Sequence, residues 1–318
     1  MSYNVSSLSQ YVDQRGKDIL FDLVAGGEFL NSPFGTIRVV EGVKDGTLLD
    51  IHVGTNTLEF QAGTCVNTPS GGTTFDKVQI GTTLFTHYAE FCGQDLASKF
   101  PVLLRAGAES QAEWPETIMR NYIEQANSQV NLAYWRAGYN SYSTDLNLNG
   151  GGILYRLIRT SLSASTYTVA GTNQLSTLGY AFSAANAINT LKLLAANRPA
   201  STYAAPVEFR MGPESFEQLK FANVAANLYH FAPSADPYRM PIDGMVNAYA
   251  VCDFGLAGAK AIVAITPDSI AFGCDLVSDI EDVAFGYDRR DNIMWMRIGF
   301  SIGAQVLKEN EIGVITWA

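Results

Sequence analysis

The stretch 292–306, Asn-Ile-Met-Trp-Met-Arg-Ile-Gly-Phe-Ser-Ile-Gly-Ala-Gln-Val, does most to decide the fold of this chain. Successive side chains of a β-strand point to opposite faces, so apolar residues at every second position predict one strand with one buried face. At about 3.4 Å per residue this strand is more than about 40 Å long. The predicted buried face comprises Met294, Met296, Ile298, Phe300, Ile302, Ala304 and Val306.

The residues before this strand predict its neighbours. Val283–Tyr287 is predicted to be a shorter strand, and the charged residues 288–291 form a turn, so 281–306 is expected to be a strand pair. Further upstream, Ala259–Thr266 is a continuous apolar run of the kind that buried strands carry. The last part of the chain is therefore predicted to be rich in β-structure.

Residues 111–137 carry the strongest helix pattern in the sequence. Pro115 suits the first turn, Glu113 and Glu116 suit the positive end of a helix, and Gly138 suits its stop. The helix would be about 40 Å long, which matches the long strand, so we expect the two to pack together as a spine. The apolar residues recur at three- and four-residue spacing, as Trp114, Ile118, Met119, Tyr122, Ile123, Ala126, Val130, Ala133 and Trp135.

The remaining segments separate into an arm, a hairpin and a lobe. Residues 1–48 are predicted to form an extended arm with at most one short helix. From Leu48 to Thr86, short β-patterns flank a glycine-rich interruption at 70–72, which predicts a projecting β-hairpin. Between 160 and 270, helical and strand patterns alternate, which predicts a mixed α/β lobe. The elements expected there are a helix at 178–197, a strand at Val207–Met211 and a helix that begins at Pro213.

Composition favours a protein that associates with its own copies and does not read DNA. Only 16% of the 318 residues are charged, against roughly 25% in typical soluble domains, so some neutral or apolar surface is expected to meet partners. The net charge is −10, so the basic patch of a nucleic-acid binder is not expected. The sequence shows no signal peptide and no apolar run long enough to cross a bilayer, which predicts a cytoplasmic product.

The residue types that usually carry chemistry are few and scattered. His52, His87 and His230 lack ligand spacing, and the four cysteines form no Cys-x-x-Cys pair. Gly255–Lys260 lacks the spacing and the following Ser or Thr of a phosphate-binding loop. The acidic segment Asp275–Asp282 departs from the calcium-loop pattern, so a solvated turn is favoured over a cation site. We therefore predict no catalytic, metal-binding or cofactor-binding residues, and a protein that is not an enzyme.

Several short motifs accompany this order of elements. They are Tyr134-Trp-Arg-Ala-Gly138, Gly152-Ile-Leu154, Gly255-Leu256, Ala264-Ile-Thr-Pro-Asp268, Gly273-Cys-Asp275 and Gly303-Ala-Gln-Val306. With the order of elements over most of 40–318, they resemble the major capsid proteins of tailed bacteriophages. That family has the Hong Kong 97-type fold, which herpesvirus capsid floors and encapsulin compartments share. The resemblance implies an α+β fold with an N-terminal arm, an extended β-hairpin loop, a peripheral domain with a long spine helix and long strands, and a mixed α/β axial domain.

The resemblance also implies how the chain is divided and what it builds. In that family the hairpin lies over a neighbouring subunit, and the axial domains meet around pentamer and hexamer axes. The implied function is structural: the chain assembles into an icosahedral shell that encloses packaged double-stranded DNA. The implied divisions are an N-terminal arm at 1–48, an extended loop at 49–100, a peripheral domain at 101–160 with the spine helix at 111–137, an axial domain at 161–272 and returning peripheral strands at 273–318.

Partners and a location follow from the same resemblance. The chain is expected to bind copies of itself as hexamers and pentamers, a portal protein, a scaffolding protein and, as a further candidate, a decoration protein. The arm is too short for the scaffolding segment that some relatives carry, so the scaffolding protein is expected to be separate. DNA is enclosed without sequence-specific binding, no cofactor or membrane is involved, and the location is the virion capsid, assembled in the cytoplasm of a bacterial host. The candidate interface residues are Phe60, Gly71, Gly72, Phe75, Trp114 and Trp135, with packing inside the subunit as the alternative for the two tryptophans.

Two other functions stay open at this point. An encapsulin-like compartment would share the fold and would differ by a groove for a cargo peptide, which the sequence does not show. An unrecognised α/β enzyme would instead require a pocket with converging polar groups.

Overall fold

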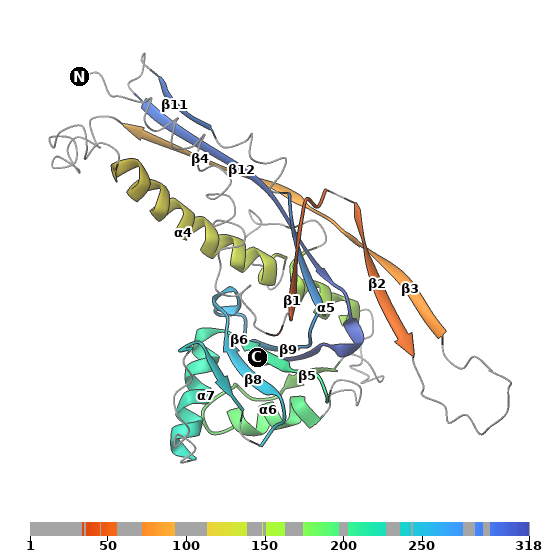
Figure 1. The fold of residues 1–318 in the computed structure, drawn as a ribbon. Coiled ribbons are helices and arrows are strands. Elements are labelled where there is room, and N and C mark those ends of the chain that lie inside the picture. Colours follow the sequence, from red (N-terminus) through yellow and green to blue (C-terminus); the bar gives the residue numbers. More distant parts are fainter. Residues whose placement is uncertain are drawn as a thin grey trace.

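A computed structural model of the chain describes residues 34, 36–44, 46–55, 72–92, 113–138, 148, 151–162, 174–196, 203–226, 236–242, 244–275, 284–288 and 293–317. Figure 1 shows a long, narrow sheet with a helix beside it, a two-stranded ribbon that extends away from the other elements, and a lobe made of a second sheet and two helices. The arrangement is mixed α/β, with few helices and several sheets among these residues.

The longest strand, β12 (Ile293–Val306), organises a five-stranded sheet. Its bounds confirm the strand predicted at 292–306. One edge of β12 pairs antiparallel with β4 over 293–302, and the other edge pairs with β11 and then β10. Strand β1 adds to β10 in parallel. The bounds of these partners are Ile37–Glu41 for β1, Thr83–Cys92 for β4, Ile270–Cys274 for β10 and Ala284–Asp288 for β11.

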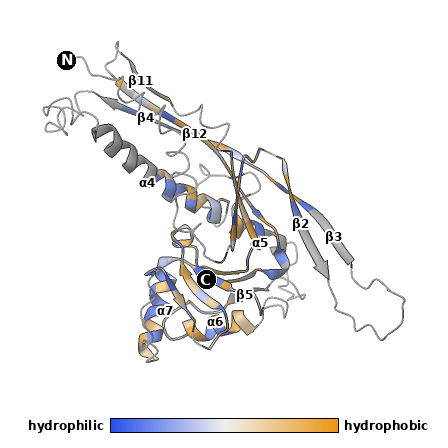
Figure 2. Cartoon of the chain, viewed as in Figure 1, coloured by the Kyte–Doolittle hydropathy of each residue, from blue (hydrophilic) through white to orange (hydrophobic). Residues whose placement is uncertain are grey.

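Helix α4 (Glu113–Arg136) lies beside this sheet and shares a hydrophobic core with it. The bounds of the helix confirm the prediction for 111–137, and the shared core confirms that helix and strand form one spine. Helix α5 (Ile153–Leu162) packs against both α4 and β12. Figure 2 shows hydrophobic residues interspersed with hydrophilic ones along β12. The buried residues of that strand include Met296, Ile298, Phe300, Ile302, Ala304 and Val306, as the period of two requires.

The predicted hairpin is present as a separate ribbon of two strands, β2 (Thr47–Thr55) and β3 (Gly72–Ile80). The strands pair antiparallel over their whole length, and the segment that would form the tip lies outside the described residues. A small cluster holds the base of the ribbon to the five-stranded sheet. Its buried members are Val43, Leu49, Ile80, Ala271 and Leu307.

A six-stranded sheet forms the lobe, in the order β5-β13-β9-β6-β8-β7. Helices α6 (Ala187–Ala196) and α7 (Pro213–Ala225) share a core with one face of it. The other face contributes alternate residues of β9 to the core of the spine. The strands are β5 (Gln174–Leu178), β6 (Val207–Met211), β7 (Arg239–Pro241), β8 (Ala248–Cys252), β9 (Ala261–Ile265) and β13 (Gly313–Trp317), with single 3₁₀ turns η5 (Phe254–Leu256) and η7 (Glu309–Glu311).

Strand pairing divides the chain differently from the predicted boundaries at three places. Strand β1 falls within 1–48, yet it is a sheet strand beside β10 and not part of an extended arm. Strand β4 falls within 49–100, yet it pairs with β12 and not with the hairpin. Strand β13 falls within 273–318, yet it lies between β5 and β9 in the lobe. A local pattern predicts that a strand forms, but it does not specify which sheet receives it.

The helix expected at 178–197 is shorter than predicted. Leu178 is the last residue of β5, and α6 begins nine residues later at Ala187. Between them the side chain of Asn186 accepts a hydrogen bond from the backbone N–H of Ser183, at 2.8 Å, which holds a turn. Phe182 is buried in the core from within this turn, so the apolar spacing continued through residues that are not helical.

Candidate assembly surfaces

The direction of the ribbon is set where β12 crosses the link between β3 and β4. A Cβ atom on Gly303 would overlap with the backbone carbonyl of Gly81, so only glycine permits this close approach of two backbones. Next to it, the side-chain amide of Gln305 donates to the backbone carbonyl of Gln79, at 2.8 Å. The base of the ribbon is therefore tied to the end of the longest strand.

Close to its base the ribbon carries exposed side chains. Leu48 is 55% exposed, and the side chains of Asp50 and Lys77 are 79% and 62% exposed. Asp50 lies opposite Lys77 in the register, with Oδ1 and Nζ 3.8 Å apart. An exposed pair of this kind contributes at most about 1 kcal/mol. The ribbon thus presents two strands to its surroundings without the support of a second layer in the described residues (Figure 1).

A second exposed surface lies on the face of the five-stranded sheet that is turned away from α4. Alternation along β4 places Leu84 and Tyr88 there, 57% and 54% exposed. The ring of Tyr88 stacks at 6.3 Å on Trp295 of β12. Exposed apolar side chains grouped on a sheet face are typical of protein interfaces.

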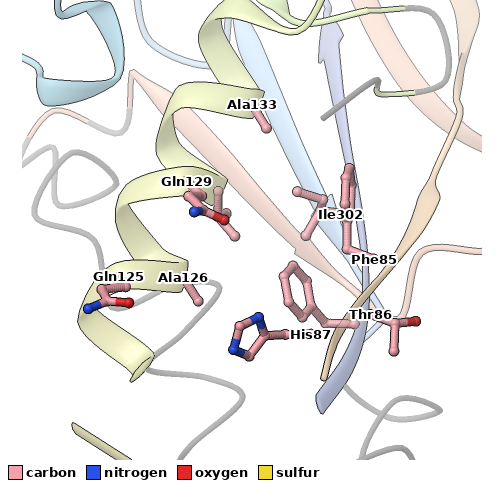
Figure 3. A pocket seen from close by; sticks show the side chains of 10 residues that line it. Phe85, Thr86, His87, Gln125, Ala126, Gln129, Ala133 and Ile302 are labelled. Carbon is pink, nitrogen blue, oxygen red and sulfur yellow. The ribbon is translucent and has the colours of Figure 1, made fainter. Parts of the chain in front are cut away.

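The face turned toward α4 is hollowed at one point. Figure 3 shows Gln125, Ala126, Gln129 and Ala133 of α4 on one side of a pocket, with Phe85 and His87 of β4 on the other. Its volume is about 270 Å³. The lining mixes apolar side chains with the polar side chains of Thr86, His87, Gln125 and Gln129.

The C-terminal end of α4 is buried in the core of the spine. The rings of Tyr134 and Trp135 contact Phe272 of β10, with centroids 4.1 and 6.3 Å away. A Cβ atom on Gly255 would overlap with the indole of Trp135, so η5 approaches the helix at a glycine. Burial raises the pKa of Tyr134 well above its ordinary value, so the phenol is neutral. This end of the helix joins the two sheets.

The lobe also contains a buried cluster of charges. Arg210 of β6, 1% exposed, donates from Nη2 and Nε to Oε2 of Glu208, at 2.9 and 3.2 Å, and from Nη1 to Oδ2 of Asp253, at 3.1 Å. Nη2 of Arg239 donates to Oε1 of Glu208, at 2.8 Å. The hydroxyl of Thr36, just before β1, donates to Oε2 of Glu208, at 2.5 Å. Two guanidinium groups therefore balance two carboxylates.

Desolvation acts strongly on this cluster. Burial raises the pKa of Asp253, and this effect outweighs the opposing effects of Arg210 and of the hydrogen bond from the backbone N–H of Gly255. Buried charges are tolerated only when they are paired and hydrogen-bonded. The cluster is thus a structural joint between β6, β7, β8 and the residues that precede β1.

The predicted interface residues have different positions. Gly72 is the first residue of β3, opposite Thr55, and Phe75 lies on β3 opposite His52. Trp114 is the second residue of α4. Trp135 is fully buried in the core that α4 shares with the five-stranded sheet. Phe60 and Gly71 lie outside the described residues.

Sequence reasoning missed the charge cluster. The segment Val207-Glu-Phe-Arg-Met211 carries two charges inside a strand that is buried at every position. Charged residues on a buried strand need partners. Two charged residues within an otherwise apolar strand were therefore the feature of the sequence that could have predicted a buried charge cluster. Asp253 and Arg239 could not be assigned as the partners, because pairing between distant segments leaves no local pattern.

Within the described ranges, no helix is long and apolar enough to span a membrane. The same residues contain no group of three or more His, Cys, Asp or Glu side chains that could hold a metal ion. Cys252 is partly buried, and burial raises its pKa to about 11, so its thiol stays protonated near neutral pH.

Solved structures of phage and phage-like capsids have the same fold. A chain of the capsid of Myoviridae phage XM1 superposes with a TM-score of 0.52 at 12% identity, covering 89% of this chain and 90% of that one. A chain of the capsid of the native GTA particle superposes with a TM-score of 0.52 at 15% identity, and the alignment covers 89% of this chain and 88% of that one. A third match is a chain of the procapsid of satellite phage P4, a structure that includes the size determination protein Sid. Its TM-score is 0.54 at 10% identity, and the alignment covers 100% of this chain and 92% of that one.

The chain therefore has the fold of phage capsid proteins. More particularly, the alignments cover 89% of this chain or more, at 10–15% sequence identity, so the fold is shared over most of its length. No family model matches the sequence. No curated protein matches it either.

Proposed function

We propose that this chain is the major capsid protein of a tailed bacteriophage, with a Hong Kong 97-type fold, and that it assembles as hexamers and pentamers into an icosahedral shell. The observation that carries the proposal is the extent of the structural match: the alignments with capsid chains cover 89–100% of this chain, which is more than any one of its sheets and helices. A match of one lobe alone would be far less informative, because single folds host many functions.

The exposed surfaces suit this role. The ribbon of β2 and β3 extends from the body, so it can lie over the sheet of a neighbouring subunit, where Leu84 and Tyr88 offer apolar contact. The lobe with α6 and α7 would meet its copies around the pentamer and hexamer axes. The protein acts through repeated geometry and not through catalysis.

The negative charge of the chain suits a shell that encloses DNA without binding its phosphates. With a net charge of −10 the subunit repels phosphates at short range, and this repulsion is screened beyond about 8 Å at physiological salt. Double-stranded DNA would be packaged through a portal protein into a shell built around a separate scaffolding protein, with a decoration protein as a further partner. Assembly would take place in the cytoplasm of the bacterial host.

The test is to express the chain with and without the product of its neighbouring scaffolding gene, and to examine the particles by electron microscopy and analytical ultracentrifugation. We expect closed shells, or free hexamers and pentamers when the scaffolding protein is absent. A monomer under both conditions contradicts the proposal. Shells that carry a cargo enzyme on their inner face and never incorporate a portal would identify the compartment alternative.

Shortening the ribbon is expected to abolish shell formation and leave the subunit folded. Residues 51–76 would be replaced by Asn-Gly, a two-residue turn that connects Asp50 and Lys77 in their native register. The buried base, Leu49 and Ile80, is kept. Shells are counted by sedimentation, and the thermal unfolding temperature of the isolated subunit is measured.

The matched control for this deletion replaces Lys77 with glutamine in the full-length ribbon. That change removes an exposed ion pair 3.8 Å long, so shell yield should stay within about twofold, since such pairs contribute at most about 1 kcal/mol. Normal shells from the shortened ribbon would contradict its role as a bridge between subunits.

A further inference from the structure

Strand β1 buries few of its own side chains. Among the described strands it pairs only with β10, through five residue pairs. Arg38, Val39 and Glu41 are exposed, and Ile37 is the single residue of the strand that is buried. A strand with so little buried side-chain area is held largely by its backbone pairing and by what fixes its ends.

The beginning of β1 is fixed by the charge cluster of the lobe. Thr36 is completely buried, and its hydroxyl donates to Oε2 of Glu208, at 2.5 Å. The ring of Phe34 lies 4.3 Å from the guanidinium of Arg239 and 4.8 Å from the ring of Tyr249. A polar contact and an aromatic contact thus attach the residues before β1 to β6, β7 and β8.

Glu208 connects this attachment to the interior of the lobe. Oε2 accepts hydrogen bonds from both Thr36 and Arg210, and Oε1 accepts one from Arg239. Arg210 in turn holds Asp253. The side chain of Arg239 is 11% exposed, whereas those of Glu208, Arg210 and Asp253 are at most 1% exposed. The cluster therefore has a closed inner half and an outer half that includes the contacts to Phe34 and Thr36.

We propose that the outer half of this cluster is a latch, and that β1 is a strap that the latch holds over the edge of β10. When the contacts of Thr36 and Arg239 are lost, the Ile37 end of β1 detaches while the lobe stays folded, because Arg210 continues to pair Glu208 with Asp253. The other end stays attached, because Val43 is buried and its backbone N–H donates to the carbonyl of Cys274, at 3.1 Å. Detachment of this end uncovers the backbone of β10 from Ile270 onward, and an uncovered strand edge can accept another strand. The latch thus controls access to this edge, and it does so whether or not the chain forms a shell.

Hydrogen–deuterium exchange of the purified subunit tests the latch. Thr36→Val is nearly isosteric and removes the hydrogen bond, and Arg239→Met removes the cation that contacts Phe34. Either change should accelerate amide exchange at 37–41 by about ten- to a hundredfold, the range that corresponds to one hydrogen bond to a charged group. Exchange in β9, at 261–265, should stay within about twofold on the same scale.

Arg38→Met is the matched control, because Arg38 is an exposed residue of the strap itself. It should leave exchange at 37–41 unchanged. Three results would each overturn the proposal: no acceleration in either latch variant, equal acceleration at 37–41 and 261–265, or acceleration by the control as large as by Thr36→Val. Arg239→Lys keeps the charge and loses the flat guanidinium, so its rate of amide exchange at 37–41 should lie between those of the wild type and Arg239→Met.

Discussion

Arg210→Met is expected to lower the free energy of unfolding of the subunit by about 3–5 kcal/mol, the range measured when one partner of a buried ion pair is removed. Arg210 is 1% exposed and contacts the carboxylates of both Glu208 and Asp253. Methionine fills much of the same space but leaves Asp253 buried without the cation of Arg210, while Glu208 keeps its contacts with Arg239 and Thr36. Urea unfolding followed by circular dichroism measures the change.

Two further variants separate the charge effect from a packing effect. Adding Asp253→Asn to Arg210→Met removes one orphaned carboxylate, so part of the lost stability should return. Lys77→Met, which breaks an ion pair that is more than half exposed on both sides, should change the free energy of unfolding by at most about 1 kcal/mol. If the double variant is no more stable than Arg210→Met, the loss comes from the cavity and not from the buried charge.

Trp135→Ala is expected to cost about 3–5 kcal/mol, the usual range for removing a large aromatic side chain from a core. Trp135 is fully buried, its ring edge meets Phe272, and Gly255 packs directly on it. The substitution therefore opens a cavity where α4, β10 and η5 meet. Chemical denaturation of the isolated subunit gives the loss, and shell yield should fall with it.

Ser128→Ala is the control on the same helix, because Ser128 is exposed. Alanine has the higher helix propensity, so this change should be neutral or stabilising by a few tenths of a kcal/mol. A loss below about 1 kcal/mol for Trp135→Ala would mean that the junction collapses around the cavity and that α4 does not depend on this contact.

Periodicity was most informative where an element is long and one of its faces is buried. The strand at 292–306 and the helix at 111–137 were predicted almost to the residue, because their patterns persist over many turns or alternations. Their similar length also predicted that they pack together, and the shared core confirms it. Patterns of short elements were less informative. The apolar spacing predicted one helix over 178–197, but the helix begins only at Ala187, after a turn in which the side chain of Asn186 accepts a hydrogen bond from Ser183.

Long-range pairing could not be predicted. Nothing in the local pattern of β1 distinguishes a strand that extends a sheet from one that lies alone, and its partner β10 lies about 230 residues later. The same applies to Glu208 and Asp253, whose shared partner is known only once β6 and β8 are adjacent. The candidate interface residues depend on contacts between copies, so the ribbon experiment, and not the subunit fold, tests them.

The position of β13 between β5 and β9 affects how the protein is made. Neither the lobe sheet nor the pairing of β1 can be completed until the ribosome has passed the codons for 313–317 and 270–274. At about 5–20 residues per second, β1 waits roughly ten to fifty seconds for its partner. A nascent chain therefore lacks a finished subunit surface during most of its synthesis. If the chain forms the proposed shell, this delay suppresses polymerisation on the polysome. Prematurely terminated chains, which lack β13, should be degraded instead of being built into particles.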